Sequence, residues 1–429
     1  MGLTSAAGLA ALRNRDFSRY LTSSFLATVA LAMQGVALGW QIYDLTGSPF
    51  QLGLVGLMEF LPAFCLALVT GHIADRFDRR LIMVVGLTAE VAASVVLVSM
   101  VLFDQVSAAG ILGVAFAFGV VRAVSTPAQR AMMPNLVPKT EFPSAVAWSS
   151  FSWQVATIGG PAVGGLLYVL GPAVVYSATA LALLASAVAI GGISPQPPKI
   201  AMERPSLVSL LAGIMLIFRH KLLLGAISLD LFAVLFSGAV ALLPVYAKDI
   251  LHTGAEGLGI LRSAPGLGAV ATSIVLTQWP LKRHVGRRLF FAVGIFGLAV
   301  IAFGLSRDYL LSYLALVVLG MADNVSVYVR GSIVPLATPD GLRGRVVAVE
   351  SVFIGASNEL GAFVAGSGAA LLGPVAAVVL GGSLTLGVAM LWSAIFPSLR
   401  RVDRMESIQA TAPPGFAAAG PGDRLKEPV

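Results

Sequence analysis

The chain has 429 residues, of which 57% are hydrophobic and 11% charged, and its formal net charge is +7. About a quarter of the residues of a soluble domain are charged, so this composition excludes an ordinary soluble protein. The basic residues are dispersed over short loops without a nucleic-acid motif, which argues against a nucleic-acid partner. Cys65 is the single cysteine, so the chain has no internal disulfide and no cysteine-rich metal site.

Long apolar runs follow one another along most of the chain. About 20 apolar residues are enough for a helix to cross a bilayer. The first run is not followed by a small-residue cleavage site, so we interpret it as a retained span. The sequence predicts an all-α membrane protein with twelve transmembrane helices. They are expected near residues 20–43, 50–70, 81–103, 108–128, 143–169, 173–192, 222–246, 255–278, 289–305, 309–329, 344–370 and 375–396.

The basic residues are strongly biased toward alternate loops. Of the 28 Lys and Arg residues, only Lys248 and Arg307 fall in odd-numbered loops, and only Arg122 and Arg262 fall inside the runs. Cytoplasmic loops carry the excess of Lys and Arg, so this bias predicts that both termini are cytoplasmic. The same residues would lie near anionic lipid headgroups.

A break in composition divides the runs into two sets of six. Residues 194–206 contain four prolines and two basic residues, which is typical of a linker. We therefore expect an N-terminal six-helix half (1–193), a cytoplasmic linker (194–206), a C-terminal six-helix half (207–404) that opens with an amphipathic stretch, and a disordered cytoplasmic tail (405–429).

The two halves also resemble each other. An offset of 201 residues superposes Pro134 on Pro335 and Gly165 on Gly366 without a gap. Chance is an alternative in a chain so rich in Gly and Ala, but the proline pair falls in the same kind of loop each time. Two pseudo-symmetric halves repeated in parallel are the architecture of major facilitator transporters.

The loop after the second run resembles the major facilitator motif G-x-x-x-D-R-x-G-R-R. Its motif positions hold Gly71, Asp75, Arg76, Arg79 and Arg80, while Asp78 replaces the second Gly. The resemblance implies a conformational latch, in which the aspartate faces the start of span 11 near Arg343 to Arg345. The second-half copy, residues 282–288, has no aspartate, so its latch is expected to be weak or absent. Alternatively, both loops only determine topology.

Span 5 resembles a motif associated with exporters. The matching residues are Gly160, Pro161, Gly164 and Gly165, and with Ala156 they form a strip of small residues that another helix can approach closely. Span 8 offers a counterpart in residues 264–269. Packing without directional meaning is the alternative.

Longer stretches, residues 134–138 and 330–361, resemble the major facilitator branch that includes enterobactin exporters and macrolide effluxers. The resemblance covers about residues 10–400. It implies a monomer that carries amphiphilic small molecules at a site between its halves, without a cofactor or metal.

Ionisable residues inside the runs are candidates for proton coupling, because each costs about 2.5–3.5 kcal/mol on insertion scales and usually faces the bundle interior. Glu59, Asp230 and Glu359 are expected to reach a central cavity, whereas Glu350 is expected to have a structural role. The alternative for each acid is a permanent ion pair with Arg122 or Arg262.

Arg122 matches the arginine of the family pattern R-x-x-Q-G, although Ser125 and Thr126 replace the Gln and Gly. The resemblance implies that it steers proton movement by holding a carboxylate. The offset of 201 places it opposite Asp323, so we consider an Arg122–Asp323 pair across the halves.

Recognition of an amphiphile needs an apolar and aromatic lining with a few polar groups. The cavity candidates are Gln34, Trp40, Gln41, Trp153, Gln154, Phe232, Phe236 and Asn358.

Three functions remain open. The first is proton-coupled export, by antiport, of amphiphiles such as drugs or siderophores across a bacterial inner membrane. The second is proton-independent uptake or facilitated transport on the same fold. The third is a membrane scaffold or sensor that transports nothing. The sequence has no nucleotide-binding loop, metal-ligand cluster or nucleophile elbow, so we do not expect an enzyme.

Overall fold

The structure is a computed structural model that describes residues 11–138, 140–194 and 207–408. The N-terminal part contains a short 3-10 helix and six long helices. These are η1 (Ala11–Arg13), α1 (Arg15–Thr46), α2 (Pro49–Arg76), α3 (Arg79–Leu102), α4 (Ala108–Leu136), α5 (Phe142–Val169) and α6 (Pro172–Gly191). Within this half, α1 packs against α5 and α6, α2 against α4, and α3 against α6.

The C-terminal part repeats this arrangement with a more broken first span. Its elements are α7 (Leu207–Arg219), α8 (Lys221–Ser237), η2 (Ala239–Leu242), α9 (Leu243–Val245), η3 (Tyr246–Ile250), α10 (Gly254–Gln278), α11 (Val285–Leu305), α12 (Tyr309–Ala337), α13 (Asp340–Leu372), α14 (Pro374–Ile395), α15 (Pro397–Arg400) and η4 (Met405–Ser407). Gly238, with a φ of 37°, ends α8 and breaks this span.

Eleven helical segments of the described chain are long and apolar enough to cross a membrane. The helix α5 has spanning length, 28 residues, but Ser and Gly residues dilute its apolar character and it is not among the eleven. The expected set of twelve spans is compatible with this arrangement. Several helices start at side-chain caps: the Asn14 side chain accepts from the backbone of Asp16 and Phe17 at the start of α1, and Asp308 caps α12.

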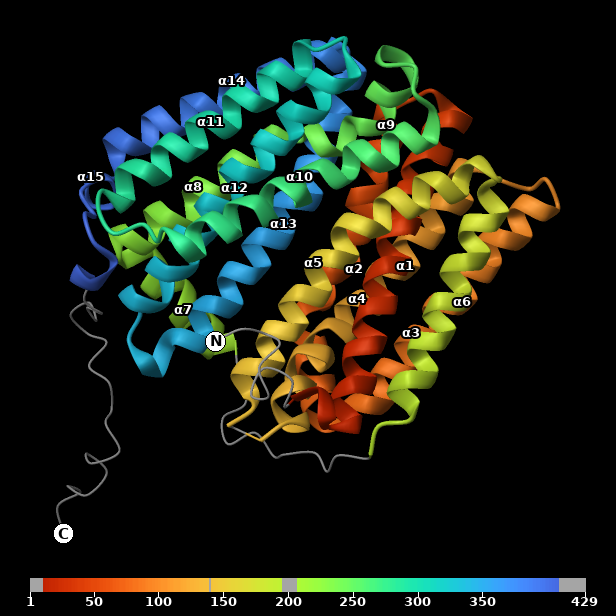
Figure 1. Cartoon of the computed structure of the whole chain (residues 1–429), viewed down its shortest axis with the longest axis horizontal. Helices are drawn as coiled ribbons and strands as arrows, with labels where there is room; N and C mark the ends of the chain where they lie inside the picture. Colours follow the sequence, from red (N-terminus) through yellow and green to blue (C-terminus); the bar gives the residue numbers. More distant parts are fainter. Residues whose placement is uncertain (1–10, 139, 195–206, 409–429) are drawn as a thin grey trace.

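Figure 1 shows two helical bundles that meet near α9 and α10 and diverge toward the ends where α1 begins and α15 lies. We call the side where α1 begins and α14 ends the terminal side, and the opposite side the far side. The halves contact each other mainly through two helix pairs, α5 with α10 and α2 with α13, and also where α1 meets α9 and α10 and where α2 meets η2.

Close glycine contacts join the halves toward the far side. A Cβ added to Gly165 of α5 would lie 2.9 Å from the Cα of Gly259 on α10. A Cβ added to Gly53 of α2 would lie 3.1 Å from the Cα of Gly366 on α13. We call these two contacts the far-side seams. No side chain separates the backbones there, and this closeness is what glycine permits.

Polar contacts add to the closure of the far side. The Tyr43 hydroxyl of α1 donates to Asp249, and the Asp44 carboxylate lies 2.5 Å from the Lys248 ammonium. Both pairs link α1 to the residues around η3.

Several sequence boundaries differ from the structure; α4, for example, continues to Leu136 rather than stopping near 128. The helix α12 continues to Ala337 rather than stopping near 329, because the apolar pattern persists through residues 333–337. The expected linker lies almost wholly outside the described residues, and so does the tail after residue 408. The first part of that expected tail forms η4, and Met405 and Ile408 pack against the C-terminal core.

Candidate functional site

A cavity of about 680 Å³ lies between the two halves. Its lining comes from α1 to α5 on one side and from η2, α10 and α13 on the other. Apolar side chains make up much of the wall, among them Leu31, Leu38, Leu52, Val55 and Phe118. Such a chamber is of the size and character that holds a small amphiphilic molecule.

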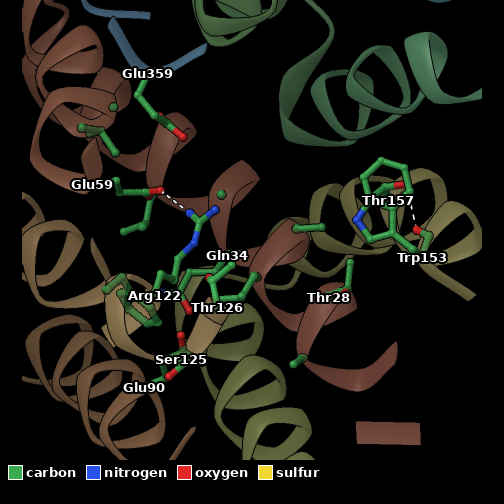
Figure 2. A pocket seen from close by; sticks show the side chains of 18 of the residues that line it. Thr28, Gln34, Glu59, Glu90, Arg122, Ser125, Thr126, Trp153, Thr157 and Glu359 are labelled. Carbon is green, nitrogen blue, oxygen red and sulfur yellow. Dashed lines mark hydrogen bonds and ion pairs between the residues drawn. The ribbon is translucent and has the colours of Figure 1, made fainter. Parts of the chain in front are cut away.

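An ion pair stands in the wall of this cavity (Figure 2). The Arg122 guanidinium of α4 donates to the Glu59 carboxylate of α2 at 2.8 Å. The Arg122 side chain is 47% exposed and that of Glu59 is 21% exposed, so both face the open space rather than the packed core. The pair is therefore accessible from the cavity.

A second arginine approaches from the other half. Arg262 of α10 donates to the backbone carbonyl of Gly35 on α1 at 3.1 Å. Glu359 of α13 lies against α2, where a Cβ on Gly56 would be 3.3 Å from its carboxylate oxygen. Arg262 interacts electrostatically with both Glu59 and Glu359. The cluster thus includes charges from both halves.

Glu90 of α3 is a further member that the sequence analysis did not select for coupling. It is 4% exposed, lines the cavity and interacts electrostatically with Arg122 and Glu59. In Figure 2 it lies beside Ser125 below Arg122. A carboxylate in the middle of an apolar run was the available signal, but depth along a run does not reveal which neighbouring helix the side chain faces.

The charges of this cluster do not balance. Three carboxylates, of Glu59, Glu90 and Glu359, stand with two guanidiniums, of Arg122 and Arg262. Arg130 also lines the cavity but is exposed and lies two turns along α4 toward the terminal side. One carboxylate of the inner cluster therefore has no guanidinium of its own, and uptake of a proton would neutralise it.

The expected cavity residues separate into two groups. Gln34 and Trp153 line the cavity, and Trp153 with Gln154 lines a second space of about 780 Å³ that is bounded by α1, α4, α5 and α10. The Nε2 atom of Gln34 has no hydrogen-bond partner and is buried.

The other candidates lie elsewhere in this structure. The Trp40 ring packs on Tyr168, and Gln41 accepts a hydrogen bond from the Tyr176 hydroxyl at 2.5 Å, both inside the N-terminal bundle. The rings of Phe232 and Phe236 stack within the core of the C-terminal half. Asn358 is exposed and donates to the carbonyl of Ile354. Helical spacing alone cannot distinguish the cavity face from these packed faces.

Asp230 does not reach the cavity, and the expectation that it would is wrong for this structure. It is 7% exposed and forms an ion pair with Arg330 of α12, which also lies 3.4 Å from Glu350 of α13. Arg330 had been assigned to a loop because span 10 was ended too early.

The suggested pair of Arg122 with Asp323 is also absent from this structure, where Arg122 pairs with Glu59 of its own half. Asp323 lies on α12 and is not among the residues that line the two cavities. Equivalent depth in the two halves did not bring these residues together, because their helices pack against different neighbours.

The latch residues are described in part. The side chains of Gly71, Asp75 and Arg76 lie outside the described residues. Arg79 donates to the carbonyl of Ala131 on α4 at 2.8 Å, and Arg80 donates to the carbonyl of Gly191 on α6. These two arginines thus hold helix ends of their own half.

Asp78, the one departure from the motif, has a local role. Its side chain accepts from the backbone N–H of Arg80 and caps α3. In the second copy the carboxylate comes from another segment: Asp403 accepts from the backbone N–H of His284 at 2.9 Å, just before α11.

The small residues of span 5 face two helices. Gly160 lies against Ala32 of α1 and Gly164 against Met33, while Gly165 meets α10 at the far-side seam. Pro161 is buried in α5, and its carbonyl lies next to Gly259. The expected counterpart on α10 divides between two neighbours: Gly266 lies against Ile158 of α5, whereas Gly268 packs against α12.

Comparison with known proteins identifies the family to which this architecture belongs. The family described as transmembrane secretion effector matches residues 6–419. The chain therefore belongs to this family of major facilitator transporters, and it is a transporter rather than an enzyme.

Characterised relatives include the enterobactin exporter EntS of Citrobacter koseri, which is 25% identical over 400 residues, with 92% of this chain and 95% of the relative covered. The enterobactin exporter EntS of Escherichia coli O1:K1 is 26% identical over 399 residues, with the same coverage. These relatives and the apolar helices indicate a multi-pass protein of the bacterial inner membrane.

Solved structures share the fold. The nucleoside transporter NupG gives a TM-score of 0.70 at 13% identity and covers 89% of this chain and 100% of its own. A bacterial homologue of the human lysosomal transporter Spinster, in an inward-facing and unoccupied conformation, gives a TM-score of 0.69 at 13% identity, with 90% and 96% covered. The predicted major facilitator fold is confirmed.

Proposed function

We propose that this transporter is a proton-coupled exporter, an antiporter of amphiphilic small molecules such as siderophores or drugs. The observation that carries the proposal is the cavity cluster, in which three carboxylates share two guanidiniums. A proton on one of these carboxylates changes the charge that a bound substrate meets. Substrate and proton can therefore compete for one site, which is the requirement for antiport.

The arrangement supports a specific sequence of events. With Arg122 paired to Glu59 at 2.8 Å, the remaining charge falls on Glu90 and Glu359, which interact electrostatically with the same arginine. Proton uptake by one of them from the outside would release the substrate there. Return of the protonated transporter to the conformation with a cavity toward the terminal side would let the proton leave into the cytoplasm.

The proposed direction of transport and the proposed class of substrate are supported by different observations. The bias of the basic residues supports cytoplasmic termini, and with this orientation the far-side seams would lie toward the outside. The small-residue motif of α5 and the relatives named as enterobactin exporters favour export. The apolar wall with Trp153 and Gln34 suits a molecule with both apolar and polar parts.

The test is flux in proteoliposomes that contain an internal pH dye. A proton gradient is imposed, and a panel of cationic drugs and catecholate siderophores is added. The wild type is compared with Glu59→Gln, Glu90→Gln and Glu359→Gln. Asp104→Asn serves as the matched control, because Asp104 is exposed in the turn after α3 and lies outside the cavity.

Each result has a defined meaning. Substrate-dependent proton flux that is lost in a cavity variant and kept in Asp104→Asn supports antiport. Substrate movement without proton flux in the wild type favours facilitated transport and makes the carboxylates structural ion pairs. Binding of a substrate without any flux favours a sensor or scaffold.

A further inference from the structure

A second charged cluster lies in the C-terminal half, away from the cavity. Arg330 of α12 forms an ion pair with Asp230 of α8 and lies 3.4 Å from the carboxylate of Glu350 on α13. The side chains of Arg330, Asp230 and Glu350 are 6%, 9% and 12% exposed, respectively. None of the three lines either of the two cavities described above.

The cluster lies well inside the bundle. Asp230 is nine residues from the start of α8, Arg330 is seven from the end of α12, and Glu350 is ten from the start of α13. At 1.5 Å per residue these positions are about 10–15 Å from the terminal-side ends. Buried apolar residues stand within four positions of them on the same helices: Ala226, Ile227 and Leu229 on α8, Val329, Ile333 and Val334 on α12, and Val346 and Val349 on α13.

The charges of this cluster are unequal. Two carboxylates meet one guanidinium, so full ionisation leaves one negative charge in apolar surroundings. An unpaired buried charge is strongly unfavourable, and a group in such a place takes up or loses a proton instead. The electrostatic partner of Glu350 is Arg330. Other ionisable groups of α7, α8, α12 and α13 stand farther along these helices: Arg219, His220 and Lys221 at the α7–α8 corner, Arg343 and Arg345 near the start of α13, and Asp323 and Glu359 farther from the terminal side. Further elements that pack against α8 or α12 carry Arg287 and Arg288 at the start of α11, Arg400 on α15 and Glu406 on η4.

The N-terminal half indicates that the fold does not need charge at this place. Under the offset of 201 the equivalent positions are Val29, Gln129 and Ser149, which are all neutral. Gln129 donates to the Ser24 hydroxyl at 3.2 Å, so a neutral hydrogen bond links α4 to α1 there. The charged triad is therefore a feature of the C-terminal half alone.

From these observations we infer that Asp230, Arg330 and Glu350 form a second proton-binding site, separate from the cavity cluster. The site holds one proton shared by its two carboxylates. In that state one carboxylate pairs with Arg330 and the other is a neutral acid, so the cluster has no net charge. The proton thereby stabilises the attachment of α13 to α8 and α12. Since α13 also supplies Glu359 to the cavity, this attachment fixes the helix that bears a cavity carboxylate.

The proposal can be tested on purified protein in detergent, without substrate or a gradient. Infrared spectroscopy at pH 7.5 detects the carbonyl stretch of protonated carboxyl groups. Glu350→Gln and Asp230→Asn are each expected to lose the intensity of one such group, because in either variant the remaining carboxylate pairs with Arg330 and ionises. Asp104→Asn, a change of an exposed acid, is expected to leave the band unchanged.

Thermal unfolding provides the second measurement. Each single variant is expected to keep a melting temperature at or above that of the wild type, since each retains a neutral pair. The double variant Asp230→Asn/Glu350→Gln leaves Arg330 uncompensated and is expected to melt lower than both. The proposal is overturned if the band is unchanged in both single variants, or if both single variants melt well below the wild type. Neither readout depends on transport, so failure of the antiport proposal would leave this test intact.

Discussion

Arg262 on α10 donates a hydrogen bond to the backbone carbonyl of Gly35 on α1, at 3.1 Å, and so joins the two halves at the wall of the cavity. The acceptor is a backbone carbonyl, so its position changes only when α1 itself moves. The bond therefore depends on the relative position of the halves, and it must break when α10 separates from α1.

The first prediction concerns Arg262. Lysine keeps the charge but lacks the planar guanidinium that reaches both the carbonyl and the neighbouring carboxylates, so Arg262→Lys is expected to lower the initial transport rate by about tenfold, or about 1.4 kcal/mol. Arg262→Met is expected to lose more, because it also removes the positive charge near Glu359. Initial rates in proteoliposomes decide the matter, with Arg288→Lys near the start of α11 as the control. Equal initial transport rates for Arg262→Lys and the wild type would contradict this prediction.

The second prediction concerns the far-side seam on α5. An alanine at Gly165 would place its Cβ 2.5 Å from the carbonyl oxygen of Ala255, so the halves could not close as observed. Gly165→Ala is expected to reduce transport and to raise the reactivity of a cysteine introduced at Val169 toward an impermeant thiol reagent. Gly159→Ala is the matched control, because the added Cβ meets nothing within 4 Å. Similar reactivity in both variants would refute the assignment.

The third prediction concerns the partner of Arg122. In a double-mutant cycle on thermal stability, Arg122→Ala and Glu59→Ala are expected to be coupled by about 0.5–3 kcal/mol, because the two side chains are hydrogen-bonded. Arg122→Ala and Asp323→Ala are expected to be additive within about 0.5 kcal/mol. Coupling of Arg122 with Asp323, together with additivity of Arg122 and Glu59, would instead support the Arg122–Asp323 pair that the sequence suggested.

The fourth prediction concerns the segment after α14. The backbone N–H of His284 donates to the Asp403 carboxylate and holds the pKa of that carboxyl below its usual value. A carboxyl whose pKa is lower in the folded state contributes stability above its unfolded pKa and loses that contribution as the pH falls through the folded value. The carbonyls of Asp403 and Val402 also accept from Val285 and Gly286.

Asp403→Asn is therefore expected to speed hydrogen exchange of the Val285 and Gly286 amides at pH 7, where the wild type is protected. In the wild type this protection is expected to weaken below the normal aspartate pKa of about 3.9, after correction for intrinsic exchange rates. Exchange that is the same in variant and wild type at pH 7 would show that the carboxylate does not hold this segment. Glu406→Gln, a change in the same segment, serves as the control.

Apolar run length and the bias of basic residues were enough to predict the class of fold, because the bilayer imposes both on any spanning helix. The charge pairs were not predictable to the same degree. Glu59, Arg122, Arg262 and Glu359 were selected because charge inside a span is costly, and the structure places all four around one cavity. Which acid pairs with which arginine depends on which helices are neighbours, and the hydropathy of the sequence does not predict these neighbours.

The Asp230 cluster illustrates how a boundary error propagates. Ending span 10 at residue 329 placed Arg330 in a loop, so only Arg122 and Arg262 were considered as partners of Asp230. The helix in fact continues for eight more residues and buries Arg330 at 5% exposure.

The far-side seams determine how this end of the protein can open. At Gly165 with Gly259, and at Gly53 with Gly366, backbone meets backbone, so there is no side chain that could swing aside on the picosecond-to-nanosecond timescale of rotamer changes. Separation of the seams requires whole bundles to move, which takes microseconds to milliseconds. A molecule in the cavity therefore cannot pass these seams through brief local fluctuations, and its passage requires the slow exchange of conformations.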